Sequence, residues 1–139
     1  MNTPSILLVD DDADDREIII DALKTLNADV KVTTADNGEA ALRILSSLLM
    51  PEKTPCLIVM DLNMPRMNGV QTLQNMKRDE RLRNIPTIIY STSVNELERE
   101  KCIILGAHSY ITKPLSYREC LETARLFLLL CQTKSIHEI

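Results

Sequence analysis

The sequence has few aromatic residues, no tryptophan and no long apolar run. Aromatic side chains make up 3% of its 139 residues, which disfavours a flavin-binding protein, because such a site needs rings to stack on the cofactor. No apolar segment approaches the ~18 residues that a membrane-spanning helix requires. The segment Met1–Ser5 has neither the basic nor the apolar region of an export signal. We therefore expect a cytoplasmic protein that makes no membrane contact.

The four cysteines lack the spacing of a metal site or a disulfide framework. They are far apart, with no CxxC pair and no neighbouring histidine at ligand spacing: Cys56, Cys102, Cys120 and Cys131. Cytosolic proteins of this size rarely contain disulfides. We interpret all four as small buried apolar side chains rather than as disulfide partners.

The charge is moderately negative and unevenly distributed. The formal net charge is −4, and residues 1–40 contain ten acidic residues but only three basic ones. A basic segment at residues 77–83 has no aromatic residues within it, so it is typical of a solvated face rather than of a nucleic-acid surface. We expect no nucleic-acid binding.

The apolar residues alternate between strand-like runs and helix-like periodicity five times along the chain. This pattern predicts strands near residues 6–9, 30–34, 56–60, 85–90 and 108–112, and helices near residues 14–27, 38–50, 70–76, 94–105 and 116–132. In the first helix Ile18, Ile19, Ala22, Leu23 and Leu26 are expected on one buried face. Ser93 and Gly106 are the expected caps of the fourth helix.

Five such units favour an α/β fold with an open, doubly wound parallel sheet. We expect them to fill residues 1–139 as one domain, with no output domain. In sheets of this kind the working site lies beyond the carboxyl ends of the strands. The residues just after the predicted strands are Asp10, Asp11 and Asp12, then Asp61, then Ser91 and Thr92, and finally Lys113.

These strand-end residues predict phosphoryl chemistry. Clustered carboxylates repel one another in a partly dry cleft, so they require a cation. Oxygen ligands without His or Cys favour Mg²⁺ over Zn²⁺. A lysine and a hydroxyl group facing the same point can bind the oxygens of a phosphate.

Four segments carry a resemblance to bacterial response-regulator receiver domains. The segments are Leu8–Asp11, Met60–Pro65 with Asn68-Gly69, Tyr90–Thr92 and Gly106–Pro114, in the order and spacing of that family. The resemblance extends over about residues 5–130 and is greatest to the stand-alone receivers paired with phytochrome-type and other hybrid sensor kinases. It implies a three-layer, flavodoxin-like (CheY-like) fold with five parallel strands in the order 2-1-3-4-5.

The resemblance also implies roles for individual residues. Asp61 would be the phosphoacceptor, and Lys113, across a cis bond to Pro114, would pair with the phosphoryl oxygens. Mg²⁺ would be held by Asp10, Asp11, Asp61 and the backbone carbonyl of Asn63. Ser91 and Tyr110 would be the switch residues. Asp12 leaves the first-strand assignment ambiguous by one residue, whereas Asp14 and Asp15 are interpreted as acids that complement the helix dipole.

The same resemblance implies a partner rather than a substrate. A sensor histidine kinase or phosphotransfer protein would supply the phosphoryl group to a protein that promotes only its own phosphorylation and dephosphorylation, and an unidentified protein would be the downstream target. Residues 126–131 are apolar all the way around the last helix. This pattern indicates a partner surface or a homodimer through the fourth helix, fifth strand and fifth helix.

Two alternatives use the same residues differently. A phosphohydrolase of the haloacid-dehalogenase type also has an Asp nucleophile, and Asp10-x-Asp12 imitates its opening motif. That family requires a late acidic pair, for which this chain offers only Glu119, Glu122 and Glu138 after the lysine. A receiver-like module that works without phosphorylation is the other alternative, and the intact set of strand-end residues argues against it.

Overall fold

A computed structural model describes residues 3–137, with side chains described for residues 3–132. Its five parallel strands follow the order β2-β1-β3-β4-β5, as predicted. The strands are β1 (Ser5–Val9), β2 (Lys31–Ala35), β3 (Leu57–Met60), β4 (Thr87–Ser91) and β5 (Ser109–Thr112). The helices are α1 (Ala13–Leu26), α2 (Gly38–Ser47), α3 (Gly69–Arg78), α4 (Glu96–Ile104) and α5 (Tyr117–His137).

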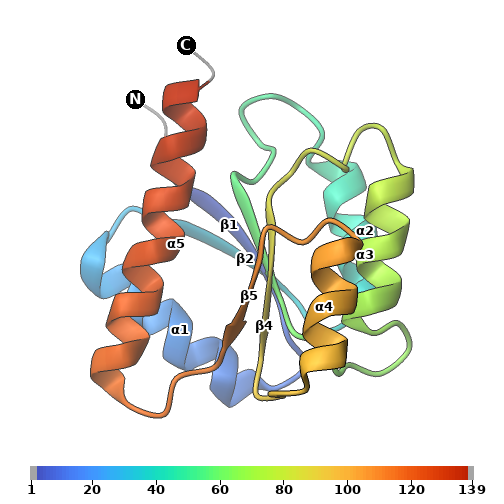
Figure 1. Cartoon of the computed structure of the whole chain (residues 1–139). Coiled ribbons are helices and arrows are strands. Elements are labelled where there is room, and N and C mark those ends of the chain that lie inside the picture. The colour runs from blue at the N-terminus through green and yellow to red at the C-terminus, as the bar shows by residue number, and fades with distance from the viewer. Residues whose placement is uncertain (1–2, 138–139) are drawn as a thin grey trace.

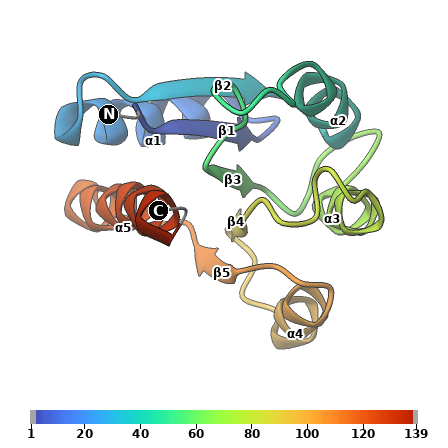
Figure 2. The same ribbon diagram turned by 90° about the horizontal axis from the view of Figure 1, so that it is seen from above.

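The sheet lies between two layers of helices. Figure 2 shows α1 and α5 on one face and α2, α3 and α4 on the other. Strands β3 and β4 are buried along their whole length, which explains their continuous apolar runs, whereas the edge strand β2 is mostly exposed. No helix in the described part of the chain is long and apolar enough to cross a membrane.

The register of the strands aligns their carboxyl ends. Val9 at the end of β1 pairs with Ala35 on one side and with Met60 on the other, and Ser91 pairs with Thr112. The residues that follow these strands therefore meet at one edge of the sheet, where the sequence predicts a site.

The buried stripe of α1 is narrower than expected. Ile19, Ala22 and Leu23 are buried, but Ile18 is 55% exposed, so its predicted burial is wrong. The reason is angular. Ile18 lies about 100° around the helix from Ile19, whereas Ala22 and Leu23 lie close to the face of Ile19.

The caps of the helices are partly as expected. Gly106 ends α4 with a φ of 105°, a conformation that favours glycine. The N-cap of α4 is Asn95, whose side chain accepts the N–H groups of Leu97 and Glu98, so the assignment to Ser93 is wrong. Both residue types can cap a helix, and the path of the chain after β4 decides between them.

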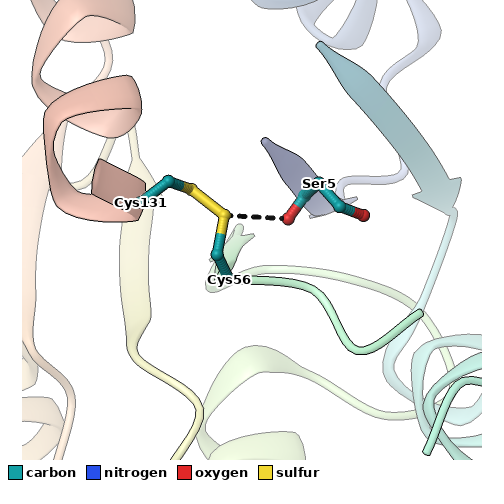
Figure 3. The surroundings of a disulfide bond; sticks show 3 residues. All are labelled: Ser5, Cys56 and Cys131. Atoms are coloured by element: carbon teal, nitrogen blue, oxygen red, sulfur yellow. Dashed lines mark hydrogen bonds between the residues drawn. A yellow bond between two sulfur atoms is a disulfide. The ribbon is translucent and has the colours of Figure 1, made fainter. Parts of the chain in front are cut away.

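The cysteines are only half as predicted. Cys102 and Cys120 are buried free thiols, but Cys56 and Cys131 form a disulfide between residues 75 positions apart. Figure 3 shows Cys131 of α5 bonded to Cys56, which lies just before β3. The Sγ atom of Cys56 lies 3.2 Å from the carbonyl oxygen of Ser5. The packing of α5 on the sheet brings the two Cα atoms to 5.2 Å, which sequence spacing cannot indicate.

Candidate functional site

Three backbone hydrogen bonds position the side chains at the strand ends. The N–H of Asp10 donates to the carbonyl of Ala35 at 2.9 Å, and the N–H of Asp61 donates to that of Val9 at 2.8 Å. The N–H of Lys113 donates to the carbonyl of Ser91 at 2.9 Å. Each side chain therefore leaves a rigid sheet rather than a mobile loop.

The ammonium group of Lys113 is the centre of the site. Its Nζ atom donates to Asp10 Oδ2 at 2.7 Å, to Asp15 Oδ2 at 2.8 Å and to Asp61 Oδ2 at 3.1 Å. The Lys113 side chain is 9% exposed, so these contacts are poorly screened by water. An ammonium group has three N–H donors, and the three carboxylates use all of them.

The protonation of the site follows from these contacts. Burial alone would lower the pKa of Lys113, but hydrogen bonds to Asp10 and Asp15 and the charge of Asp61 together raise it. Burial also raises the pKa of Asp10, and hydrogen bonds from Lys113 and from the N–H of Asp12 offset this only in part. Lys113 is therefore a fixed cation at neutral pH.

The carboxylates of Asp10, Asp11 and Asp61 could hold a metal ion. One oxygen of each lies within 4.8 Å of the others, and three carboxylate oxygens suit a hard cation such as Mg²⁺. Asp12 is used differently. Its side chain accepts the N–H groups of Asp14 and Asp15 as the N-cap of α1.

The site opens into a cleft of about 610 Å³. Asp61 contributes a side chain that is 12% exposed, and the cleft is also lined by Asp11, Asp12, Ala13, Asp15, Asn63, Thr92 and Lys113. The cleft is polar and strongly acidic, with one cation on its wall. Such a surface suits a metal-bound anion such as a phosphoryl group.

The loop after β3 holds the Asp61 carboxylate in place. Asp61 Oδ1 accepts the N–H of Leu62 at 2.7 Å, which leaves Oδ2 directed toward Lys113. The loop returns so closely that a Cβ atom on Gly69 would lie 2.5 Å from the carbonyl oxygen of Asp61. Glycine is therefore required at position 69 by space.

Ser91 and Tyr110 are linked behind the cleft rather than within it. Ser91 is fully buried, and its Oγ accepts the N–H of Ser93 at 3.2 Å. The hydroxyl of Tyr110 donates to the carbonyl of Ser93 at 2.9 Å. The cleft wall at this strand end is formed by Thr92.

The structure changes two expectations around Lys113. All described peptide bonds are trans, so the predicted cis bond to Pro114 is wrong. The two isomers of an X–Pro bond differ by only about 0.5–1 kcal/mol, and residue order cannot decide between them. The helix-dipole interpretation of Asp15 is incomplete, because it omits the ion pair with Lys113. The sequence did offer one indication of this contact, because side chains in the first turn of a helix lean toward its N-terminus, which here faces the site.

The late acids of the phosphohydrolase alternative lie elsewhere. Glu119 and Glu122 are on α5 rather than at a strand end, and Ser116 donates a hydrogen bond to Glu119 at 3.2 Å. Glu138 lies outside the described residues. The described part of the chain thus places neither Glu119 nor Glu122 beside Asp61.

Comparisons with known proteins identify the relatives of this chain. The sequence model of the response regulator receiver domain matches residues 6–125. The two-component response regulator ARR17 of Arabidopsis thaliana is 33% identical over 136 residues, covering 92% of this chain and 86% of that protein. The sensor histidine kinase CheAY of Helicobacter pylori is 32% identical over 83% of this chain but only 14% of its own length.

Solved structures agree in fold and carry related sequences. The phosphorylated cyanobacterial phytochrome response regulator RcpA has a TM-score of 0.79 and 29% identity, covering 88% of this chain and 89% of its own. The Mn²⁺-bound form of the response regulator Rcp1 has a TM-score of 0.76 and 28% identity, with the same two coverages.

Proposed function

Because the chain belongs to the response regulator receiver domain family, we propose that Asp61 is its phosphoacceptor in a two-component phosphorelay. The observation that carries this proposal is the placement of Asp61 in an acidic cleft, with its Oδ2 directed at the ammonium group of Lys113. Receivers of this family interact with histidine kinases or phosphotransfer proteins, and a phosphohistidine of such a protein is the proposed donor.

In the proposed step, an oxygen of Asp61 attacks the phosphorus and the P–N bond to the donor histidine breaks. The imidazole leaves with the electron pair of that bond, and an acyl phosphate remains on Asp61. Lys113 supplies a fixed positive charge beside the transferred oxygens, where electrostatic stabilisation is most effective. Water enters only in the later hydrolysis of the acyl phosphate. We propose that the protein promotes only its own phosphorylation and dephosphorylation.

We propose that Mg²⁺ is held by Asp10, Asp11 and Asp61 with the backbone carbonyl of Asn63. The clustered carboxylate oxygens and the lack of His or Cys ligands in this cluster support Mg²⁺. When bound, the ion neutralises charge on the phosphoryl oxygens. The related response regulator Rcp1 has been solved in an Mn²⁺-bound form, which supports a divalent cation as a ligand of this chain.

Phosphorylation is proposed to change a surface through Ser91 and Tyr110. The Ser91 hydroxyl would turn from the N–H of Ser93 toward the phosphoryl group, and Tyr110, which is already buried, would repack in the space beside it. Their shared contact with Ser93 supports this coupling. The two-state surface would comprise α4, β5 and α5.

This output surface, comprising α4, β5 and α5, is the proposed site of a downstream target or of a homodimer. Exposed apolar side chains on α4 and α5 support it, among them Leu97, Ile104 and Leu126. We propose that residues 1–139 act as one receiver domain whose signal leaves through this surface. We also propose a cytoplasmic location, where reductants would favour the thiol form of Cys56 and Cys131.

The phosphoacceptor is tested by intact mass after incubation with Mg²⁺ and acetyl phosphate. The parent should gain one phosphoryl group, and Asp61→Asn should gain none. Chelation of Mg²⁺ should abolish the gain in the parent. Equal labelling of the parent and Asp61→Asn would exclude Asp61, and an unlabelled parent would favour the phosphorylation-independent interaction module.

A further inference from the structure

Asp15 contacts Lys113 although it does not belong to the carboxylate cluster that could bind a metal ion. It lies in the first turn of α1, and its Oδ2 accepts a hydrogen bond from Lys113 at 2.8 Å across 98 residues of sequence. Its neighbour Asp14 has the same charge and lies in the same turn, but its side chain is exposed. None of the three donors of Lys113 is directed at Asp14. A purely dipolar role would serve equally well at either position.

The number of donors on Lys113 makes Asp15 important. All three N–H groups point at carboxylates, so binding a phosphoryl oxygen requires one carboxylate to be released. Asp61 has the longest of the three contacts, 3.1 Å, and it is also the residue that would carry the new group. The N–H now directed at Asp61 is therefore the one available to the phosphoryl oxygen.

The remaining two carboxylates, those of Asp10 and Asp15, differ in their other contacts. Asp10 belongs to the cluster that could bind a metal ion, and its Oδ1 already accepts the N–H of Asp12 at 2.9 Å. A metal ion bound to Asp10 would compete with Lys113 for the negative charge of this carboxylate. Asp15 is outside that cluster, so its contact with the ammonium group can persist when the metal is bound.

The position of Asp15 is itself held by the start of the helix. Its backbone N–H donates to the capping side chain of Asp12 at 3.2 Å. The Asp15 side chain is 35% exposed, so it can reach Lys113 without losing all contact with water. The helix cap and the Lys113 contact thus join α1 to the residue after β5.

We propose that Asp15 is a positioning residue, which holds the Lys113 ammonium group over Asp61 so that one N–H faces the incoming phosphoryl oxygen. This inference rests on the proposed phosphorylation of Asp61 and deepens it. Asp15 itself touches neither the phosphoryl group nor the metal; it acts only through Lys113.

The test compares Asp15→Ala with the matched variant Asp14→Ala, which removes the same charge from the same helical turn. Beryllofluoride, a mimic of the phosphoryl group, is titrated at saturating Mg²⁺, and the rate of labelling by acetyl phosphate is measured in parallel. Loss of a residue that orients a metal ligand typically costs roughly 10- to 100-fold, and Asp15 is proposed to orient Lys113 in a similar way. We expect a loss in this range for Asp15→Ala in both measurements, and values near the parent for Asp14→Ala.

Asp15→Glu restores the carboxylate and should recover part of the loss, which a merely structural role would not require. Thermal unfolding of all variants checks that each is folded. Equal behaviour of Asp15→Ala and Asp14→Ala would overturn the inference, as would tighter beryllofluoride binding by Asp15→Ala, because Asp15 would then be a competitor. If the parent itself is not phosphorylated on Asp61, it is the proposed function that fails.

Discussion

At the scale of single residues, the site depends on close approach as much as on charge. Gly69 lets the loop after β3 pass against the backbone of Asp61, where any side chain would collide with main-chain atoms that cannot move aside. Asp10, by contrast, is a carboxylate that is only 2% exposed and is paired with Lys113. We expect both residues to lower the stability of the fold while they fix the positions of the site's atoms, as is common at functional sites.

Gly69→Ala should both destabilise the protein and slow its phosphorylation. The added Cβ would lie 2.5 Å from the Asp61 carbonyl oxygen and 2.9 Å from Leu62 Cα, and overpacking of this kind costs roughly 1–3 kcal/mol. Gly106→Ala is the control, because its φ of 105° also disfavours alanine but it lies at the end of α4. Chemical denaturation should show a loss in both variants, whereas acetyl phosphate labelling should slow only in Gly69→Ala.

Asp10→Asn should be more stable than the parent at neutral pH. Burial raises the pKa of Asp10 above its usual value of 3.8, so the folded state holds the proton more tightly than the unfolded state. The associated stability is fully present below the unfolded pKa and is lost as the pH rises through the folded pKa. The advantage of the variant should therefore shrink as the pH is lowered toward 3.8.

Urea unfolding of both proteins at several pH values measures this difference, and the other carboxylates cancel in the comparison. A variant that is less stable than the parent at every pH would contradict the prediction. It would mean that the hydrogen bond from Lys113 to Asp10 outweighs the cost of burial.

At the scale of elements, α5 is the part of the fold that the disulfide secures. Phe127 of α5 packs edge-on against Tyr90 of β4, with ring centroids 5.6 Å apart. The Lys113 ammonium group lies 5.9 Å from the centroid of the same Tyr90 ring. One turn beyond Phe127, Cys131 joins the helix to the residue before β3. The last helix is thus attached to the sheet by apolar packing and, when Cys56 and Cys131 are oxidised, by a covalent bond.

Reduction of the disulfide should lower the free energy of unfolding by roughly 2–4 kcal/mol, because the bond restricts the unfolded chain over a long loop. The parent should therefore unfold at a lower temperature in the presence of a phosphine reductant. Cys56→Ser should unfold near the temperature of the reduced parent, and reductant should not change that temperature. A parent that is insensitive to reductant, with its thiols shown to be reduced, would contradict the expected contribution.

At the scale of the whole molecule, the proposed output surface combines exposed apolar side chains from α4 and α5. Figure 1 shows α4 beside β5 and β4, with α5 on the opposite side of the sheet. Ile104 and Leu97 on α4 are 82% and 77% exposed, and exposed apolar side chains that gather on one face can mark a partner surface. Their burial on association would be favourable in proportion to the apolar area removed from water.

Ile104→Lys should therefore weaken any association that beryllofluoride and Mg²⁺ induce, with little effect on stability, because exposed positions usually change it by no more than about 0.5 kcal/mol. Ile18→Lys is a matched control, since Ile18 is 55% exposed on α1, outside the output surface. Sedimentation velocity with and without the mimic measures the association. An identical response of the two variants would exclude Ile104 from the interface, and an unchanged size of the parent would remove the homodimer but leave a partner protein.

The order of the elements and the edge of the sheet that carries the site could be predicted from the sequence alone. Buried strands and helices leave a pattern in neighbouring residues that can be read without the structure. Residues 57–60 form a continuous apolar run, and Ile19, Ala22 and Leu23 follow helical spacing. The chemistry at the strand ends follows in turn, because parallel strands align Asp10, Asp61 and Lys113 at one edge.

Only the tertiary structure decided which distant groups meet. The pair of Asp15 with Lys113 spans 98 residues and the pair of Cys56 with Cys131 spans 75. Both depend on how α1 and α5 pack against the sheet, and one periodic pattern is compatible with many rotations of a helix about its axis. The choice of Asn95 over Ser93 as a cap has a similar cause in the path of one loop. The sequence determined which side chains stand at the strand ends, Asp61 and Lys113 among them. The packing of the helices decided that Asp15, which is not at a strand end, also contacts the lysine.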